Sequence, residues 1–220
     1  MCGRFALSAT TKDIEKLKPG LKVKSEIKPK FNISPTQSVA IIKGGDEIIL
    51  DSAHWGLIPS WAKDKSIGVK MFNARAETID EKPSFRSAFK SRRCIIPATE
   101  FYEWKKIEGN SKKQPYRIKL MNNSIFFFAG LWENWKVADS ASILSTTIIT
   151  TEPNSLMEEI HNRMPVILNE SSIDIWLNQN IDTHQLKRIL IPYSSDEMVA
   201  ETIDSNYLSN RINDGFFHNQ

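Results

Sequence analysis

Residues 93–106 read "RCIIPATEFYEWKK", a run rich in β-branched and aromatic residues that is typical of strands. Three further β-rich runs follow at 114–121, 124–135 and 142–151, and a Gly-Asn-Ser turn at 109–111 separates the first two runs. We interpret the four runs as consecutive strands of a continuous meander. A sheet is therefore expected in the middle of the chain.

The rest of the chain adds short elements to this sheet. Gly-Gly-Asp joins two β-rich runs within 38–57, which predicts a hairpin, and 164–168 predicts another strand. Helical patterns cover residues 10–20, 82–92, 152–162, 171–179 and 183–191. We expect one α+β domain over residues 1–220, with a mixed or antiparallel β-barrel-like core flanked by short helices. Residues 211–220 are expected to form a flexible tail.

Composition excludes several classes of protein. The start of the chain lacks the pattern of a secretory signal, and no apolar run approaches the roughly 20 residues that span a bilayer. Only two cysteines are present, Cys2 and Cys94, which favours a reducing compartment over a disulfide scaffold. We therefore expect a cytoplasmic protein without membrane contact. Cys94 lies in an apolar run and is interpreted as a buried small hydrophobe.

The formal net charge of +3 suits a polyanionic partner without establishing one. Lysine-rich runs at 22–30 and 105–113 are interpreted as solvated turns and loops. Arg4, Arg75 and Arg163 are single arginines in motifs that hold no other lysine or arginine, and a guanidinium matches phosphate oxygens bidentately. These three arginines are our candidates for phosphate contacts.

The first five residues, "MCGRF", carry a reactive group. After removal of Met1, Cys2 would hold an α-amine and a thiol on one carbon skeleton. Such an aminothiol can attack an aldehyde with nitrogen and then close with sulfur to a thiazolidine. The alternative is acyl transfer, with the thiol as nucleophile and the amine as base.

Three more motifs carry polar residues in unusual settings. "FNARAET" at 72–78 places Asn73, Arg75 and Glu77 at alternate positions, which is one face of an extended segment. In "EFYEW", Glu103 is a carboxylate among aromatic residues, and a buried carboxylate there suits proton transfer. "HNRMPVIL" puts His161 at the junction of a predicted helix and strand.

No cofactor or metal is expected. The four histidines are scattered, the cysteines are far apart, and no phosphate-binding glycine loop is present. Trp61 follows a Pro-Ser pair and is predicted to be exposed on a loop, where it could stack on unpaired bases, whereas Trp55 is interpreted as core.

Six motifs together resemble one family. They are "MCGRF" at 1–5, "NISP" at 32–35, "WGLIPSW" at 55–61, "NARAET" at 73–78, "RCIIPATEFYEW" at 93–104 and "HNRMPVIL" at 161–168. Their order is similar to that of the SRAP domain family, whose members process abasic sites in single-stranded DNA. The resemblance implies an α+β domain with a barrel-like core, a basic groove for DNA, and a covalent bond between the N-terminal cysteine and the ring-opened sugar of an abasic site.

The resemblance also implies roles for single residues. Cys2 would form the crosslink, Asn73 orient it and the sugar, Glu103 move protons at the amine, and His161 act on the sugar oxygen. Arg75 and Arg163 match family arginines that hold phosphates, and Arg4, Trp61 and Pro35 are further candidates for DNA contact. Lyase activity, reversal of the crosslink and autocatalytic removal of Met1 belong to the same expectation, and a monomer suffices for the chemistry.

Two departures and two alternatives stay open. Glu100 stands where many members have glycine, and "VAETIDSNYLSN" near the C-terminus differs from the family pattern, which puts contacts there in doubt. One alternative is a glutamine amidotransferase with Cys2 as its N-terminal nucleophile, although Arg4 replaces the aliphatic residue usual in that class. The other is a module that binds single-stranded DNA without a covalent bond.

Overall fold

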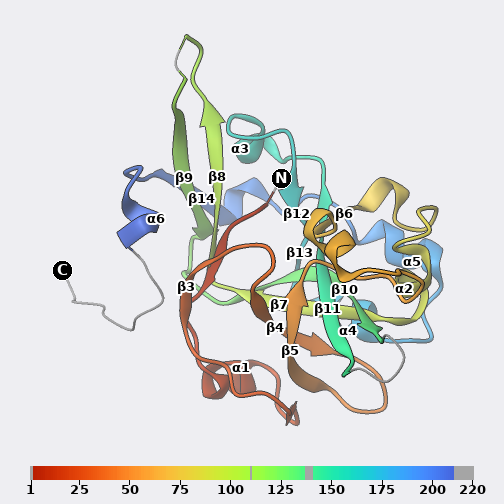
Figure 1. Cartoon of the computed structure of the whole chain (residues 1–220). Coiled ribbons are helices and arrows are strands. Elements are labelled where there is room, and N and C mark those ends of the chain that lie inside the picture. Colours follow the sequence, from red (N-terminus) through yellow and green to blue (C-terminus); the bar gives the residue numbers. More distant parts are fainter. Residues whose placement is uncertain (1, 110, 137–140, 211–220) are drawn as a thin grey trace.

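The computed structural model describes residues 2–109, 111–136 and 141–210. Its larger sheet joins strands in the order β12-β11-β10-β7-β4-β5-β2, with β6 paired to β11 and β13 paired to β10 (Figure 1). These strands are β2 (Lys22–Val23), β4 (Ser38–Lys43), β5 (Ile49–Trp55), β6 (Asn73–Arg75), β7 (Arg93–Ala98), β10 (Phe126–Trp135), β11 (Ile143–Thr151), β12 (Met164–Pro165) and β13 (Ile167–Leu168).

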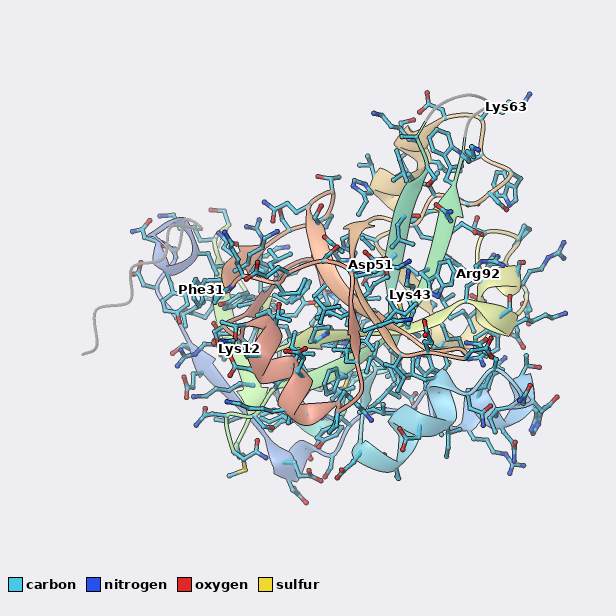
Figure 2. The ribbon with its side chains drawn as sticks, turned by 90° about the horizontal axis from the view of Figure 1, so that it is seen from below. Lys12, Phe31, Lys43, Asp51, Lys63 and Arg92 are labelled. Carbon is cyan, nitrogen blue, oxygen red and sulfur yellow. The ribbon has the colours of Figure 1, made fainter. Side chains whose placement is uncertain are left out.

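Five of these strands close into a ring. β10, β7, β4 and β5 pair antiparallel in that order, and β11 pairs antiparallel with β10 and parallel with β5. Closure removes two open edges that would otherwise expose unpaired backbone groups. On two neighbouring strands of the ring, Lys43 and Asp51 form an ion pair of 2.9 Å (Figure 2). The expected α+β class with a mixed, barrel-like core is confirmed.

A second sheet carries the N-terminal strand. Its order is β14-β9-β8-β1-β3. The strands are β1 (Phe5–Leu7), β3 (Lys30–Ile33), β8 (Glu100–Lys106), β9 (Lys113–Leu120) and β14 (Met198–Thr202). β8 and β9 form a hairpin that projects from the body of the molecule (Figure 1).

The helices are short and lie around the sheets (Figure 1). They are α1 (Thr11–Leu17), α2 (Arg86–Ser91), α3 (Ser155–Glu158), α4 (Glu170–Leu177), α5 (Thr183–Arg188) and α6 (Tyr207–Asn210), with 3-10 turns η1 (Lys65–Lys70), η2 (Ala76–Thr78) and η3 (Ser195–Glu197). The five predicted helices are confirmed in place. Among the described residues, no helix is long and apolar enough to cross a membrane.

The predicted meander is wrong in its connections. β7 and β8 are consecutive in sequence but belong to different sheets, because the chain bends at Thr99 between them. β9 then pairs with β8 and β14, and not with β10. Because of this bend, β8 pairs with the N-terminal strand β1 in the second sheet.

Aromatic packing anchors that strand in the core. The ring of Phe5 meets Trp55 edge to face at 5.1 Å between centroids and Phe128 at 5.7 Å. Burying a side chain of this kind contributes about 2–3 kcal/mol. Trp55 and Cys94 are fully buried, as predicted, and Cys2 and Cys94 are both free thiols. The expected tail at 211–220 lies outside the described residues.

Candidate active site

The strand β1 places Cys2 beside β8. Phe5 pairs with Phe101 of β8, and the backbone N–H of Tyr102 donates to the carbonyl of Arg4 at 2.9 Å. Because Phe5 is also anchored in the core, the residues just before it are held against the same sheet. The Cys2 side chain is fully buried there.

Asn73, on a strand of the larger sheet, forms a hydrogen bond with Cys2. It begins β6, whose parallel pairing with β11 aligns Asn73 with Ile148. The side-chain amide of Asn73 donates to the Cys2 carbonyl at 2.8 Å. The carbonyl oxygen of that side chain, Oδ1, is buried and has no hydrogen-bond partner among the described residues. A buried acceptor of this kind is suited to a donor on a ligand.

Glu103 supplies a buried negative charge to the same region. Its position on β8 leaves only 4% of the residue exposed. Burial raises the pKa of the Cys2 thiol, and the charge of Glu103 raises it further. The thiol is therefore protonated at neutral pH. Its conversion to a nucleophile requires a group that accepts its proton.

His161 lies between α3 and β12, at the junction predicted from the sequence. Its backbone N–H donates to the carbonyl of Met157 at 2.8 Å, and its ring nitrogen Nδ1 accepts from the backbone N–H of Arg163 at 3.1 Å. In the neutral imidazole the proton is then on Nε2. Burial lowers the pKa of His161, against the opposing effect of the Glu103 charge.

The four candidate catalytic residues thus share one neighbourhood. Asn73 contacts Cys2 directly, while Glu103 acts electrostatically on both Cys2 and His161. The polar groups available are a thiol, a carboxylate, an imidazole and an amide. This set can transfer protons around a nucleophile, and the catalytic roles of its members stay predictions.

The three candidate arginines differ in their surroundings. Arg75 is exposed at the end of β6, and Arg4 donates from Nη1 to Oδ1 of Asn32 at 2.7 Å. Arg163 has a side chain only 13% exposed, and its guanidinium forms an ion pair with Glu77. The predicted one-face arrangement of residues 72–78 is wrong at Glu77, because β6 ends at Arg75 and the chain turns into η2.

The two other predicted DNA contacts lie in loops. Trp61 is 56% exposed, which confirms the predicted exposure, and its indole N–H reaches the carbonyl of Pro83 at 3.5 Å. Pro35 is half-buried in the turn after β3. The next residue in that turn, Thr36, has a φ of 74° and donates its backbone N–H to the carbonyl of Trp55 at 2.8 Å.

A surface pocket next to His161 was missed by the sequence analysis. Its lining comes from β8, from β9 and from the segment around α3: Trp104, Lys105, Lys106, Lys113, Glu158, Glu159, Ile160, His161 and Asn162. The lysines come from the run interpreted as a solvated turn. Only their placement beside His161, which depends on the hairpin, makes them candidates for a ligand.

Comparison with known proteins places the chain in a family. Residues 1–209 match the family described as SOS response associated peptidase (SRAP). The chain belongs to the SRAP family. The abasic site processing protein YoqW of Bacillus subtilis is 46% identical over 213 residues, which cover 93% of each protein. The abasic site processing protein HMCES of Rattus norvegicus is 30% identical over 203 residues, which cover 74% of this chain and 58% of the rat protein.

The SRAP fold is also seen in solved structures. A crystal structure of a protein from Bacteroides thetaiotaomicron superposes with a TM-score of 0.86 at 30% identity and covers 94% of each chain. A Bordetella bronchiseptica protein superposes with a TM-score of 0.78 at 25% identity, covering 93% of this chain and 100% of that one.

The two departures from the SRAP pattern have local partners. The carboxylate of Glu100 accepts from the Tyr102 hydroxyl and lies 3.8 Å from the guanidinium of Arg117. Near the C-terminus, the amide of Asn32 donates to the carbonyl of Leu208 in α6 at 2.6 Å. Within the described residues, no group of three or more His, Cys, Asp or Glu side chains could hold a metal ion.

Proposed function

We propose that this chain captures abasic sites in single-stranded DNA as a covalent thiazolidine on Cys2. One observation carries the proposal: the amide of Asn73 holds the backbone of Cys2, while the buried thiol lies within the electrostatic reach of Glu103. Relatives named abasic site processing proteins support an abasic site as the substrate. The chemistry requires removal of Met1, so that Cys2 has an α-amine.

The first bond joins nitrogen to carbon. An α-amine has a pKa near 7.7–8.0, so a substantial fraction is neutral at physiological pH and attacks the aldehyde carbon C1′ of the ring-opened sugar. Glu103 accepts a proton from the nitrogen and returns one to the hydroxyl of the carbinolamine, which leaves as water. The product of this step is a Schiff base.

The second bond joins sulfur to the same carbon. The thiol adds to the carbon of the Schiff base, its proton passes by way of Glu103 to the nitrogen, and a five-membered ring closes. The overall reaction joins one aminothiol to one aldehyde and releases one water. Ring closure is intramolecular, so its effective molarity is high. The raised pKa of the thiol makes a nearby proton acceptor necessary in this step.

His161 assists before these steps. With its neutral proton on Nε2, the imidazole can donate to the sugar ring oxygen and favour opening to the aldehyde. If sulfur fails to close the ring, the Schiff base permits β-elimination of the 3′ phosphate, which is a lyase reaction. Ring closure shields the lesion from that outcome, and the same steps in reverse, with one water consumed, release the DNA.

The DNA strand is held without reading its bases. Exposed Arg75 and the lysines Lys106 and Lys113 beside His161 supply positive charge for phosphates, and exposed Trp61 supplies a stacking surface. Contacts of these kinds carry no base code, so binding is independent of sequence. The chain acts as a monomer in this scheme.

The test uses the mature protein, with loss of Met1 verified, and a single-stranded oligonucleotide that carries one abasic site. Denaturing electrophoresis should show a heat-stable shifted band for the wild type and for Cys94→Ala, which removes the other buried thiol. Cys2→Ala should abolish the band and Glu103→Gln should slow its appearance. Absence of the band from the wild type would contradict the proposal. Glutamine hydrolysis by the same preparation would then favour the amidotransferase alternative.

A further inference from the structure

Arg163 connects three parts of the fold through its guanidinium. Nη1 and Nη2 donate to the two carboxylate oxygens of Glu77 at 2.6 and 3.0 Å, and Nη2 also donates to the carbonyl of Thr150 at 2.7 Å. A two-point Arg–carboxylate contact constrains direction as well as distance. The side chain of Arg163 is therefore constrained at its two terminal nitrogens, Nη1 and Nη2.

The three connected parts all lead to the candidate site. Glu77 lies in η2, immediately after the strand β6 that presents Asn73. Thr150 lies on β11, which pairs with β6 on one side and with β12 on the other. Arg163 itself precedes β12 and follows His161 by two residues. The contact thus joins the Asn73 side of the site to the His161 side.

The backbone of Arg163 acts on the imidazole directly. Its N–H donates to Nδ1 of His161, a bond that exists only while Nδ1 carries no proton. The geometry of this two-residue turn depends on where Arg163 is held. Within the part of the chain that the structure describes, Glu77 is the only charged residue that pairs with the guanidinium of Arg163.

We propose that Glu77 is a positioning residue, which through Arg163 fixes the turn at 161–163 and holds His161 with its proton on Nε2. Glu77 itself touches no reacting atom in this arrangement. Its carboxylate is half-exposed, while the arginine side chain it holds is largely buried. The kinetic consequence of this inference rests on the proposed function, whereas the tautomer of His161 is a property of the free protein.

The experiment measures that tautomer first. Proteins labelled with 15N at histidine are compared by two-bond 1H–15N correlation spectra, at a pH about one unit above the ordinary histidine pKa of about 6.5. The signal of His161 is assigned by its loss in His161→Gln. Wild type should show the Nε2–H form. Glu77→Gln should show a mixture of both tautomers at His161, with His54 and His184 unchanged.

Asp80→Asn is the matched control. It breaks a neighbouring ion pair, that of Asp80 with Lys187 at 2.9 Å, and should leave the His161 tautomer unchanged. Glu77→Asp keeps the charge and should restore part of the Nε2–H form. If Glu77→Gln does not fold, Glu77→Asp and Arg163→Lys provide the same comparison with smaller changes.

The second readout separates catalysis from binding. Under single-turnover conditions, Glu77→Gln should slow crosslinking by roughly tenfold, because small displacements of a reacting side chain have large kinetic effects. Its affinity for an unmodified single-stranded oligonucleotide should not fall, because a negative charge near Arg75 and Arg163 has been removed.

Two results would overturn the inference. One is an unchanged His161 tautomer in folded Glu77→Gln, and another is the same loss in Asp80→Asn. Tighter DNA binding with an unchanged tautomer would show that Glu77 only withholds Arg163 from phosphates. If the wild type forms no crosslink, the proposed function fails by itself, and the tautomer measurement still decides the role of Glu77.

Discussion

The side-chain amide of Asn73 donates a 2.8 Å hydrogen bond to the backbone carbonyl of Cys2, although 70 residues lie between them in sequence. This bond connects the large sheet to the N-terminal residue that would carry the chemistry. It leaves the other polar atom of Asn73, Oδ1, buried and without a partner among the described residues. One side chain therefore both bonds to the backbone of Cys2 and leaves a buried acceptor open to a donor on a ligand.

Asn73→Ala is expected to slow crosslinking by roughly tenfold or more, because small displacements of a reacting group have large kinetic effects. The rate is measured in single turnover by denaturing electrophoresis. Asn134→Ala, which removes an exposed asparagine on β10, is the control and should react like wild type. Equal rates for both variants would show that the bond to Cys2 has no role in positioning.

Glu103→Gln is expected to lower the pKa of His161. Burial lowers this pKa below the ordinary value, and the negative charge of Glu103 raises it. Without that charge the pKa should fall further. NMR titration of the His161 ring signals measures the change. Glu159→Gln, in the same pocket, should leave the His161 pKa unchanged. A rise in the Glu103→Gln variant would contradict the electrostatic arrangement described for the site.

Arg75→Ala is expected to weaken binding to single-stranded DNA and to reduce its dependence on salt. Removing one phosphate-binding cation from a complex with a single strand lowers the slope of log K against log salt concentration by about 0.7. Fluorescence anisotropy over a salt series measures the slope. Arg86→Ala, which removes an exposed arginine on α2, should leave it unchanged. An unaltered slope in Arg75→Ala would exclude this residue as a phosphate ligand.

Asn32→Ala is expected to loosen α6 and to weaken DNA binding together. Asn32 accepts from Arg4 at 2.7 Å and donates to the carbonyl of Leu208 at 2.6 Å, so one amide joins a candidate phosphate-binding arginine to the C-terminal helix. Losing one such bond predicts an affinity lower by about threefold to tenfold. Hydrogen exchange of the peptide that contains α6 should become faster. If exchange is unchanged while affinity falls, the coupling between α6 and Arg4 is absent.

The free energy of unfolding is expected to fall above pH 9. Burial raises the pKa of the Cys94 thiol to about 12 from an ordinary 9.0. The pKa of this thiol is higher in the folded state than in the unfolded state. The buried thiol therefore contributes its full stabilisation below the unfolded-state pKa, and this stabilisation is lost as pH rises toward the folded-state pKa. The loss is about 1.4 kcal/mol per pH unit. Urea unfolding at a series of pH values should show a smaller fall in Cys94→Ala, and equal falls in the two proteins would contradict the burial effect.

Local patterns predicted helices α1 to α5, the hairpin of β4 and β5, and the burial of Trp55 and Cys94, whereas the short helix α6 was not predicted. They could not predict the parallel pairing of β11 with β5, because that pairing joins segments about 90 residues apart and depends on how both fill the barrel. The bend at Thr99 has no glycine or proline beside it that marks a change of sheet. The short strand β14 is half-exposed and shows too little alternation to stand out.

The candidate site shows the same limit. The motifs around Cys2, Asn73, Glu103 and His161 were evident as unusual stretches, and their family resemblance suggested that they meet. The partner of Arg163 was not evident, because the ion pair with Glu77 spans 86 residues and exists only after β6 turns into η2. The pocket beside His161 likewise depends on the β8–β9 hairpin and not on any local pattern.

The most direct test of the central claim is the intact mass of the product formed by the mature protein and an oligonucleotide with one abasic site, followed by mapping of the modified peptide. The account predicts the summed masses of protein and DNA less one water, with the DNA remnant on the N-terminal Cys2 peptide and no product from Cys2→Ala. A product of another mass, a remnant on another residue, or unmodified protein throughout would contradict it.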